Sequence, residues 1–88
     1  MTSPYPADQA NNANTNGPRS RPYDWVLAND ALHAFAAPTH IGQSVFAAGA
    51  VIDTRVYQPI GELAPAMATD SAATAMQHMA VVRDFVLP

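Results

Sequence analysis

The pattern of hydrophobic positions divides the chain at about residue 22. Residues 1–22 contain only two large apolar side chains, Met1 and Tyr5, among prolines, asparagines and other small or polar residues. Ordering the backbone costs about 1–2 kcal/mol per residue, and such a segment buries too little apolar area to offset that cost. We therefore expect residues 1–22 to form an extended Pro/Asn-rich arm that is ordered only by a partner, and residues 23–88 to form the folded domain.

A helical pattern follows the arm. Asp24 is a suitable N-cap, and apolar residues then recur at the three- and four-residue spacing of a helix. These residues are Trp25, Ala28, Leu32, Phe35 and Ala36. Pro38 disfavours helical geometry in the residue before it. The pattern predicts a helix over residues 24–36.

The next segment is rich in β-branched residues. Polar and apolar positions alternate after Gly49, which predicts a strand over residues 50–58. A first strand over residues 43–47 would pair with it through a turn at Ala48 and Gly49. One buried helix over residues 43–52 fits the same apolar run, so the choice between hairpin and helix stays open.

A second helical pattern begins after Thr69 or Asp70, either of which can cap a helix. Its apolar residues fall on one stripe: Ala72, Ala75, Met76, Met79, Val82 and Val86. The last part, residues 80–87, also alternates like a strand, so helix and strand both stay open there.

Together these elements predict an α+β fold, in which a small domain of two helices and a short β-hairpin follows the extended N-terminal arm. The chain has 88 residues and no cysteine, so disulfides cannot stabilise it. A single core in a domain of this size seldom supplies more than about 3–5 kcal/mol. We therefore expect burial against a partner to supply part of the stability.

The charge balance narrows the classes of partner. The formal net charge is −3, and the four cations are all arginines. Nucleic-acid binding proteins normally carry a basic patch, so we expect no nucleic-acid partner. Charged residues make up 12% of the chain, below the typical value of about 25%. A partly covered surface explains this low value, and so does the Ala-rich, Lys-poor composition of a GC-rich genome.

Nothing in the sequence is typical of a membrane protein. The longest apolar run, Val45 to Ile52, is under half of the about 20 residues that a transmembrane helix needs. Residues 1–22 lack the basic start and apolar run of a secretory signal. We expect a soluble or particle-associated (virion) protein with no membrane span.

The candidate catalytic and metal-binding residues form no recognisable motif. His33, His40 and His78 lie on separate predicted segments without the spacing of metal ligands. Ser44 and Ser71 lack the glycines that flank a nucleophile elbow, and there is no glycine-rich phosphate loop. We predict no catalytic residue, no metal site and no cofactor.

The arm and its junction with the domain carry the best candidates for partner contacts. The two prolines beside Tyr5 restrict its backbone, which lowers the entropy that its ring would lose on docking. Two arginines bracketed by prolines can donate to acidic or carbonyl groups of a partner. The predicted partner-binding residues are Tyr5, Arg19, Arg21, Tyr23 and Trp25.

These features favour a non-enzymatic structural subunit of a large assembly, such as a virion decoration, cement or joining protein. Its partners would be protein subunits of that assembly, and a homo-oligomer is compatible with the same features. An accessory or stabilising subunit of a multi-subunit enzyme complex would look similar in sequence. A free-standing small binding or inhibitor protein is the third alternative.

Overall fold

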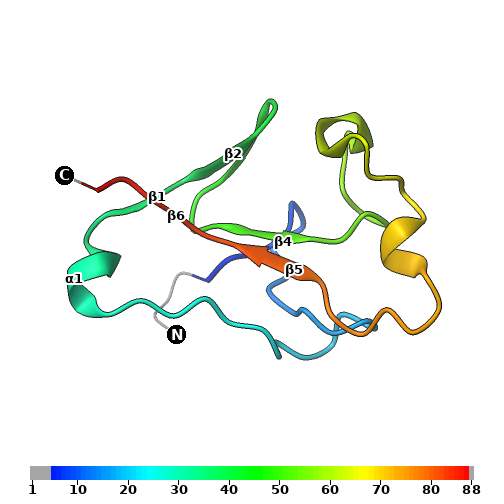
Figure 1. Cartoon of the computed structure of the whole chain (residues 1–88), viewed down its shortest axis with the longest axis horizontal. Coiled ribbons are helices and arrows are strands. Elements are labelled where there is room, and N and C mark those ends of the chain that lie inside the picture. The colour runs from blue at the N-terminus through cyan, green and yellow to red at the C-terminus, as the bar shows by residue number, and fades with distance from the viewer. Residues whose placement is uncertain (1–4, 88) are drawn as a thin grey trace.

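The computed structural model describes residues 5–87. Across these residues the chain forms three two-stranded antiparallel sheets, one short α-helix and two short 3-10 helices. Figure 1 shows the sheets near the centre and on one side, with the 3-10 helices on the other side. The predicted α+β fold of two helices and one hairpin is wrong, because the regular structure of residues 5–87 consists mostly of short strands, with one short α-helix.

The central sheet joins the middle of the chain to its C-terminal part. Strand β4 (Ala50–Ile52) pairs with β5 (Ala80–Val82), and Val51 lies opposite Val81. Strand β1 (Ala36–Ala37) pairs with β6 (Asp84–Phe85) in a second small sheet. Both pairs connect segments that are distant in sequence.

The third sheet is a local hairpin. Strand β2 (Thr39–Ile41) pairs with β3 (Ser44–Phe46), and Gly42 in the turn has a φ of +56°. The hairpin predicted between residues 43–47 and 50–58 is therefore wrong in its pairing. The first predicted strand contains β3, whereas only residues 50–52 of the second form a strand and residues 53–58 form a turn and loop. Strand β3 pairs with β2, and β4 pairs with β5.

The predicted helix over residues 24–36 is wrong for most of its length. The only α-helix among residues 5–87 is α1 (Asp30–His33), which begins where the Asn29 side chain accepts a hydrogen bond from Leu32 N at 2.8 Å. Asp24 does not cap a helix, since its carboxylate contacts His78 Nδ1 at 2.7 Å. Tertiary contacts hold residues 23–28 outside any regular element.

The second predicted helix is also wrong. Its first residues form the 3-10 helix η2 (Asp70–Ala72), and the earlier loop carries η1 (Ile60–Leu63). Ala75 has a φ of +67°, a left-handed conformation that no α-helix contains. Residues 80–85 then form β5 and β6, so the strand alternative is correct there.

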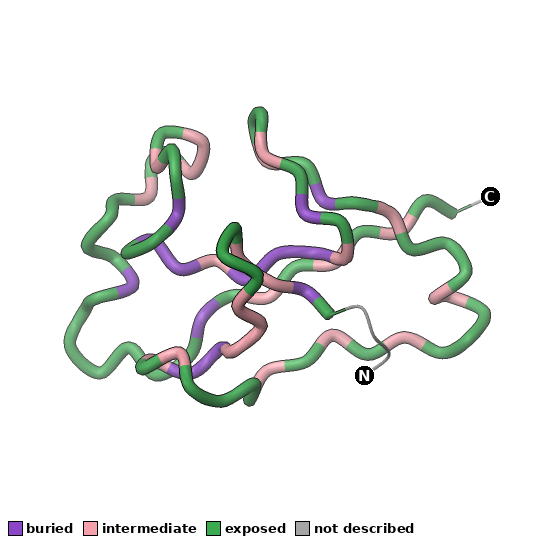
Figure 2. The backbone as a smooth tube through the Cα atoms, turned by 180° about the vertical axis from the view of Figure 1, so that it is seen from behind, coloured by how far each residue is buried: buried purple, intermediate pink, exposed green. Residues whose placement is uncertain are grey.

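The hydrophobic core is small. Among the described residues the buried core residues are Phe46, Ala50, Val51, Tyr57 and Met79, and Pro6 of the N-terminal segment is also buried. Phe46 and Tyr57 pack with ring centroids 6.0 Å apart. Figure 2 shows the buried positions near the middle of the molecule, with long exposed stretches around them.

The N-terminal segment lies against the central sheet. Ala7 N donates to Gly49 O at 3.2 Å, and Val51 N donates to Ala7 O at 3.2 Å. Met79 N donates to Thr15 O at 2.7 Å, and Thr15 is buried. The contacts of residues 5–22 are thus with the same chain, while their ordering by a partner stays a prediction.

No helix within residues 5–87 has both the length and the apolar character needed to cross a lipid bilayer.

Candidate protein-binding surface

A cluster of ion pairs connects the N-terminal segment to the end of β4. Asp53 directly follows β4 and is 1% exposed. Its Oδ2 atom accepts from Arg55 Nη2 at 2.8 Å and from Arg19 Nη1 at 3.1 Å. Burial alone would raise the pKa of Asp53, but the hydrogen bonds from Arg55 and Arg19 outweigh it, so the pKa lies below its ordinary value. The carboxylate is therefore held in its ionised form.

Arg19 faces the interior of its own chain. Its side chain is 10% exposed and also pairs with Asp8 Oδ2 at 2.9 Å. The backbone carbonyls of Asn12 and Asn14 accept its remaining hydrogen bonds at 2.9 and 2.6 Å. Because these donors are used within the chain, Arg19 acts here as an internal anchor. Its role in partner binding stays a prediction.

The aromatic candidates lie on the surface. The exposed fractions are 44% for Tyr5, 61% for Tyr23 and 44% for Trp25. The Tyr5 and Trp25 rings meet edge to face, with centroids 5.9 Å apart and an interplanar angle of 79°. The structure thus brings together an aromatic residue from the arm and one from the domain. Arg21 is exposed as well.

Tyr23 and Trp25 belong to an extended segment, residues 22–28, which runs along one side of the molecule and pairs with no strand among residues 5–87 (Figures 1 and 2). Exposure alternates along it, because Asp24, Val26 and Ala28 are partly covered. Tyr23, Trp25 and Leu27 are exposed, and Leu27 reaches 69%. We call residues 22–28 the aromatic edge.

Three contacts fix the inner side of the aromatic edge, two through its backbone and one through the Asp24 side chain. Asp24 N donates to Thr15 Oγ1 at 2.8 Å, and Arg83 Nη1 donates to the Val26 carbonyl at 3.2 Å. The hydrogen bond with His78 lowers the pKa of the Asp24 carboxyl. The edge is therefore held at the sites where it approaches Thr15, His78 and Arg83.

A second polar cluster holds the hairpin against η1. Glu62 accepts hydrogen bonds from Ser44 Oγ at 2.6 Å, from Gln43 N at 2.6 Å and from Tyr57 Oη at 2.9 Å. The hydrogen bond from Ser44, followed by those from Gln43 and Tyr57, lowers the pKa of the Glu62 carboxyl. This cluster connects the hairpin, the turn after β4 and η1 through one carboxylate.

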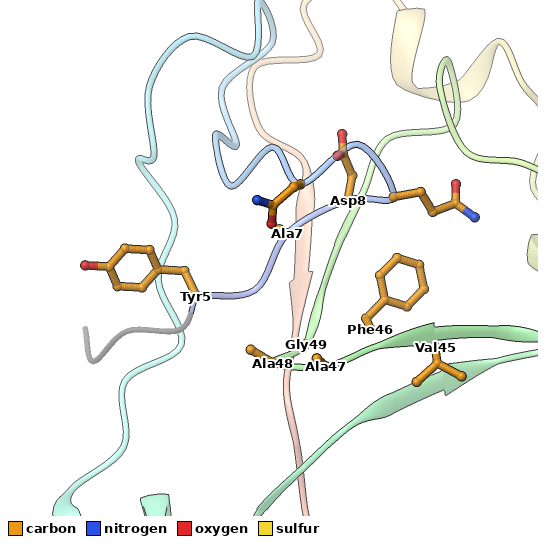
Figure 3. A pocket seen from close by; sticks show the side chains of 10 residues that line it. Tyr5, Ala7, Asp8, Val45, Phe46, Ala47, Ala48 and Gly49 are labelled. Carbon is orange, nitrogen blue, oxygen red and sulfur yellow. The ribbon is translucent and has the colours of Figure 1, made fainter.

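A cavity of about 270 Å³ lies between the arm and β3 (Figure 3). Its lining includes Tyr5, Asp8, Gln9 and Phe46. The Asp8 carboxylate points away from the Phe46 ring, toward its ion pair with Arg19. The volume is below the roughly 300–1,000 Å³ of ordinary ligand sites. This cavity is therefore a weaker candidate for a binding site than the aromatic edge.

The histidines do not converge in the structure. His78 contacts Asp24, and His33 Nδ1 lies 3.2 Å from Arg83 Nη2. His40 is exposed on β2. Within the part of the chain that the structure describes, no group of three or more acidic or histidine side chains is placed to hold a metal ion.

No protein-family model, curated protein or solved structure matches this chain. The candidate surface therefore rests on the geometry of this chain itself.

The sequence patterns did not predict Leu27 on this surface or the buried ion pair between Asp53 and Arg19. Leu27 was not singled out, although Tyr23, Trp25 and Leu27 alternate with smaller or polar residues as in a half-exposed strand. The pairing of Asp53 with Arg19 has no local signal, because the two residues are 34 positions apart.

Proposed function

We propose that this protein is a non-enzymatic structural subunit of a large assembly, such as a virion decoration, cement or joining protein. One observation carries the proposal: twelve large hydrophobic residues are exposed among residues 5–87, against five buried apolar residues in the core. Burying apolar surface stabilises a complex by about 25 cal/mol per Å². Covering these residues with neighbouring subunits would supply the burial that the small core lacks.

The distribution of the exposed residues favours several neighbours over one ligand. Leu27 lies on the aromatic edge, and Val86 and Leu87 follow β6 at the end of the described chain. Met67 and Met76 flank η2 on the far side of the molecule (Figure 1). A joining subunit needs contacts on opposite sides, whereas an inhibitor concentrates its apolar residues in one interface.

Sedimentation tests this role. A lysate of the source cells or particles is fractionated on a gradient without detergent, and the chain is quantified in each fraction. We expect it in a heavy fraction, at a constant ratio to one or a few major proteins. Recovery only at the mass of a free small protein would overturn the proposal.

A matched pair of variants tests whether the exposed surface is responsible for sedimentation in the heavy fraction. Met67→Ser removes an exposed apolar side chain beside η2, whereas Thr69→Ser changes an exposed polar residue close to it. We expect Met67→Ser to reduce the heavy fraction and Thr69→Ser to leave it unchanged. Equal behaviour of the two variants would argue against contacts on this side of the molecule.

A further inference from the structure

The aromatic edge has one backbone side that its own chain does not use. Asp24 N and the Val26 carbonyl, which belong to even-numbered residues, are hydrogen-bonded inward. In an extended chain, the backbone groups of alternate residues point to the same side. The N–H and C=O groups of Tyr23, Trp25 and Leu27 therefore point outward. Within residues 5–87 they have no backbone partner.

An open edge of this kind is a template for strand addition. Proteins commonly protect such edges with charged side chains or proline. The three outward residues of this edge are a tyrosine, a tryptophan and a leucine, without a charge among them. Pro22 falls on the inward, even-numbered side, so its missing N–H removes no donor from the open side.

We propose that a second copy of this chain pairs with the aromatic edge as an antiparallel strand centred on Trp25. The two Trp25 residues then lie opposite each other, and Tyr23 of each copy lies opposite Leu27 of the other. Each of these opposed pairs exchanges two backbone hydrogen bonds, because their groups point toward the partner strand. Aromatic and aliphatic pairs across strands add about 0.2–1 kcal/mol each.

Charge complementarity selects a second copy in this orientation. The edge has an exposed cation at one end, Arg21, and an exposed anion just past the other end, Asp30. Antiparallel pairing brings Arg21 of one copy beside the turn that carries Asp30 in the other copy. Parallel pairing would place like charges together. The segment is thus complementary to itself, as a two-fold symmetric interface requires.

The absence of cysteine in the natural sequence allows a direct test of the register. The full chain is made with single cysteines and oxidised under mild conditions. We expect Trp25→Cys to cross-link with itself, because opposed Cα atoms about 5.5 Å apart lie within disulfide reach. Tyr23→Cys and Leu27→Cys should cross-link efficiently only when mixed. Self-linking of either variant as strong as that of Trp25→Cys would overturn the register.

Association of the chain without cysteines is measured by analytical ultracentrifugation. We expect a monomer–dimer equilibrium with a mass of twice 9.3 kDa at high concentration. Leu27→Pro removes an outward N–H and should raise the dimer Kd about tenfold, equivalent to about 1.4 kcal/mol. Val26→Pro removes an inward N–H that has no partner among the described residues, and should change the Kd by less than about twofold.

Circular dichroism of each variant confirms that it remains folded. A chain that stays monomeric at millimolar concentration would overturn the proposal, as would equal effects of the two proline variants. If Leu27→Pro abolishes binding to a different protein while the natural chain is monomeric, the edge takes a foreign strand and the second-copy proposal is wrong. The dimer and the proposed structural role can fail separately, since one is measured on purified chain and the other on sedimenting assemblies.

Discussion

At the scale of single residues, Asp53 links the N-terminal segment to the end of β4. It is nearly fully buried and receives hydrogen bonds from Arg19 in the N-terminal segment and from Arg55 in the turn after β4. Arg55 also donates to the Gly17 carbonyl at 2.7 Å. One carboxylate therefore connects segments that local sequence patterns treat as separate.

We predict that Asp53→Asn prevents stable folding. Breaking a buried ion pair costs about 3–5 kcal/mol. The variant leaves the largely buried Arg19 guanidinium with Asp8 as its remaining ionic partner. That cost is comparable with the total stability of about 3–5 kcal/mol expected for a core of this size. Urea denaturation followed by circular dichroism measures the loss. Asp30→Asn, at an exposed position, is the control and should unfold like the natural chain.

The carboxylates also predict the response to acid. The pKa values of Asp53, Asp24 and Glu62 are all lowered in the folded state. Their contribution is therefore fully present above the ordinary carboxyl pKa of about 4, and it is lost as the pH falls through the lowered values. We expect the urea midpoint to be constant from pH 7 to about 5 and to fall steadily below about pH 4. A midpoint that rises on acidification would contradict the ion-pair network.

At the scale of elements, the turn before β4 depends on Gly49. Its φ is +105°, and a side chain there would collide with the backbone carbonyl oxygen of Val82 in the paired strand β5. The close approach of β4 to β5 therefore requires a residue without a Cβ atom.

We predict that Gly49→Ala destabilises the protein by about 2 kcal/mol or more, through backbone strain and the collision with Val82. Gly61→Ala is the matched control, because a Cβ at Gly61 meets no atom within 4 Å. Thermal unfolding of the two variants gives the comparison. Equal melting temperatures would show that the turn relaxes without cost.

At the scale of elements, local sequence patterns predicted the positions of strands but not those of helices. The β-branched residues near β3 and β4 indicated strands at the right places, since side-chain shape favours strands locally. The helices failed because alanine-rich segments fit periods of both 3.6 and 2 residues. In residues 23–28, contacts of Asp24 with Thr15 and His78 favour the extended form over the helix. The sequence pattern within a single segment does not predict such contacts.

At the scale of the whole molecule, the central question is what orders the N-terminal segment. In the structure, Ala7 bridges Gly49 and Val51, and Thr15 accepts from Met79 N. Sequence composition predicts instead that this segment needs a partner. The two expectations differ in their consequences for the isolated chain.

Amide hydrogen exchange separates these expectations. If the contacts within the chain suffice, the Val51 amide, which donates to Ala7 O, is protected from exchange in the purified monomer. We expect this protection, and we expect it to disappear when residues 1–22 are deleted. Fast exchange of Val51 in the full isolated chain, with slow exchange only in an assembly, would show that a partner orders the segment.

The sequence by itself determined the limits within which this protein folds: no disulfides, few charges, and too few apolar residues in the first 22 positions to build a core there. It also located short strands, because alternation and β-branching act within a few residues. Only the tertiary structure decided which strands pair, that residues 23–28 are extended, and that Arg19 is an anchor for Asp53. The physical reason is that the energies of strand pairing and ion pairs depend on residues far apart in the chain, such as positions 19 and 53. The local periodicity of the sequence does not predict contacts between such residues.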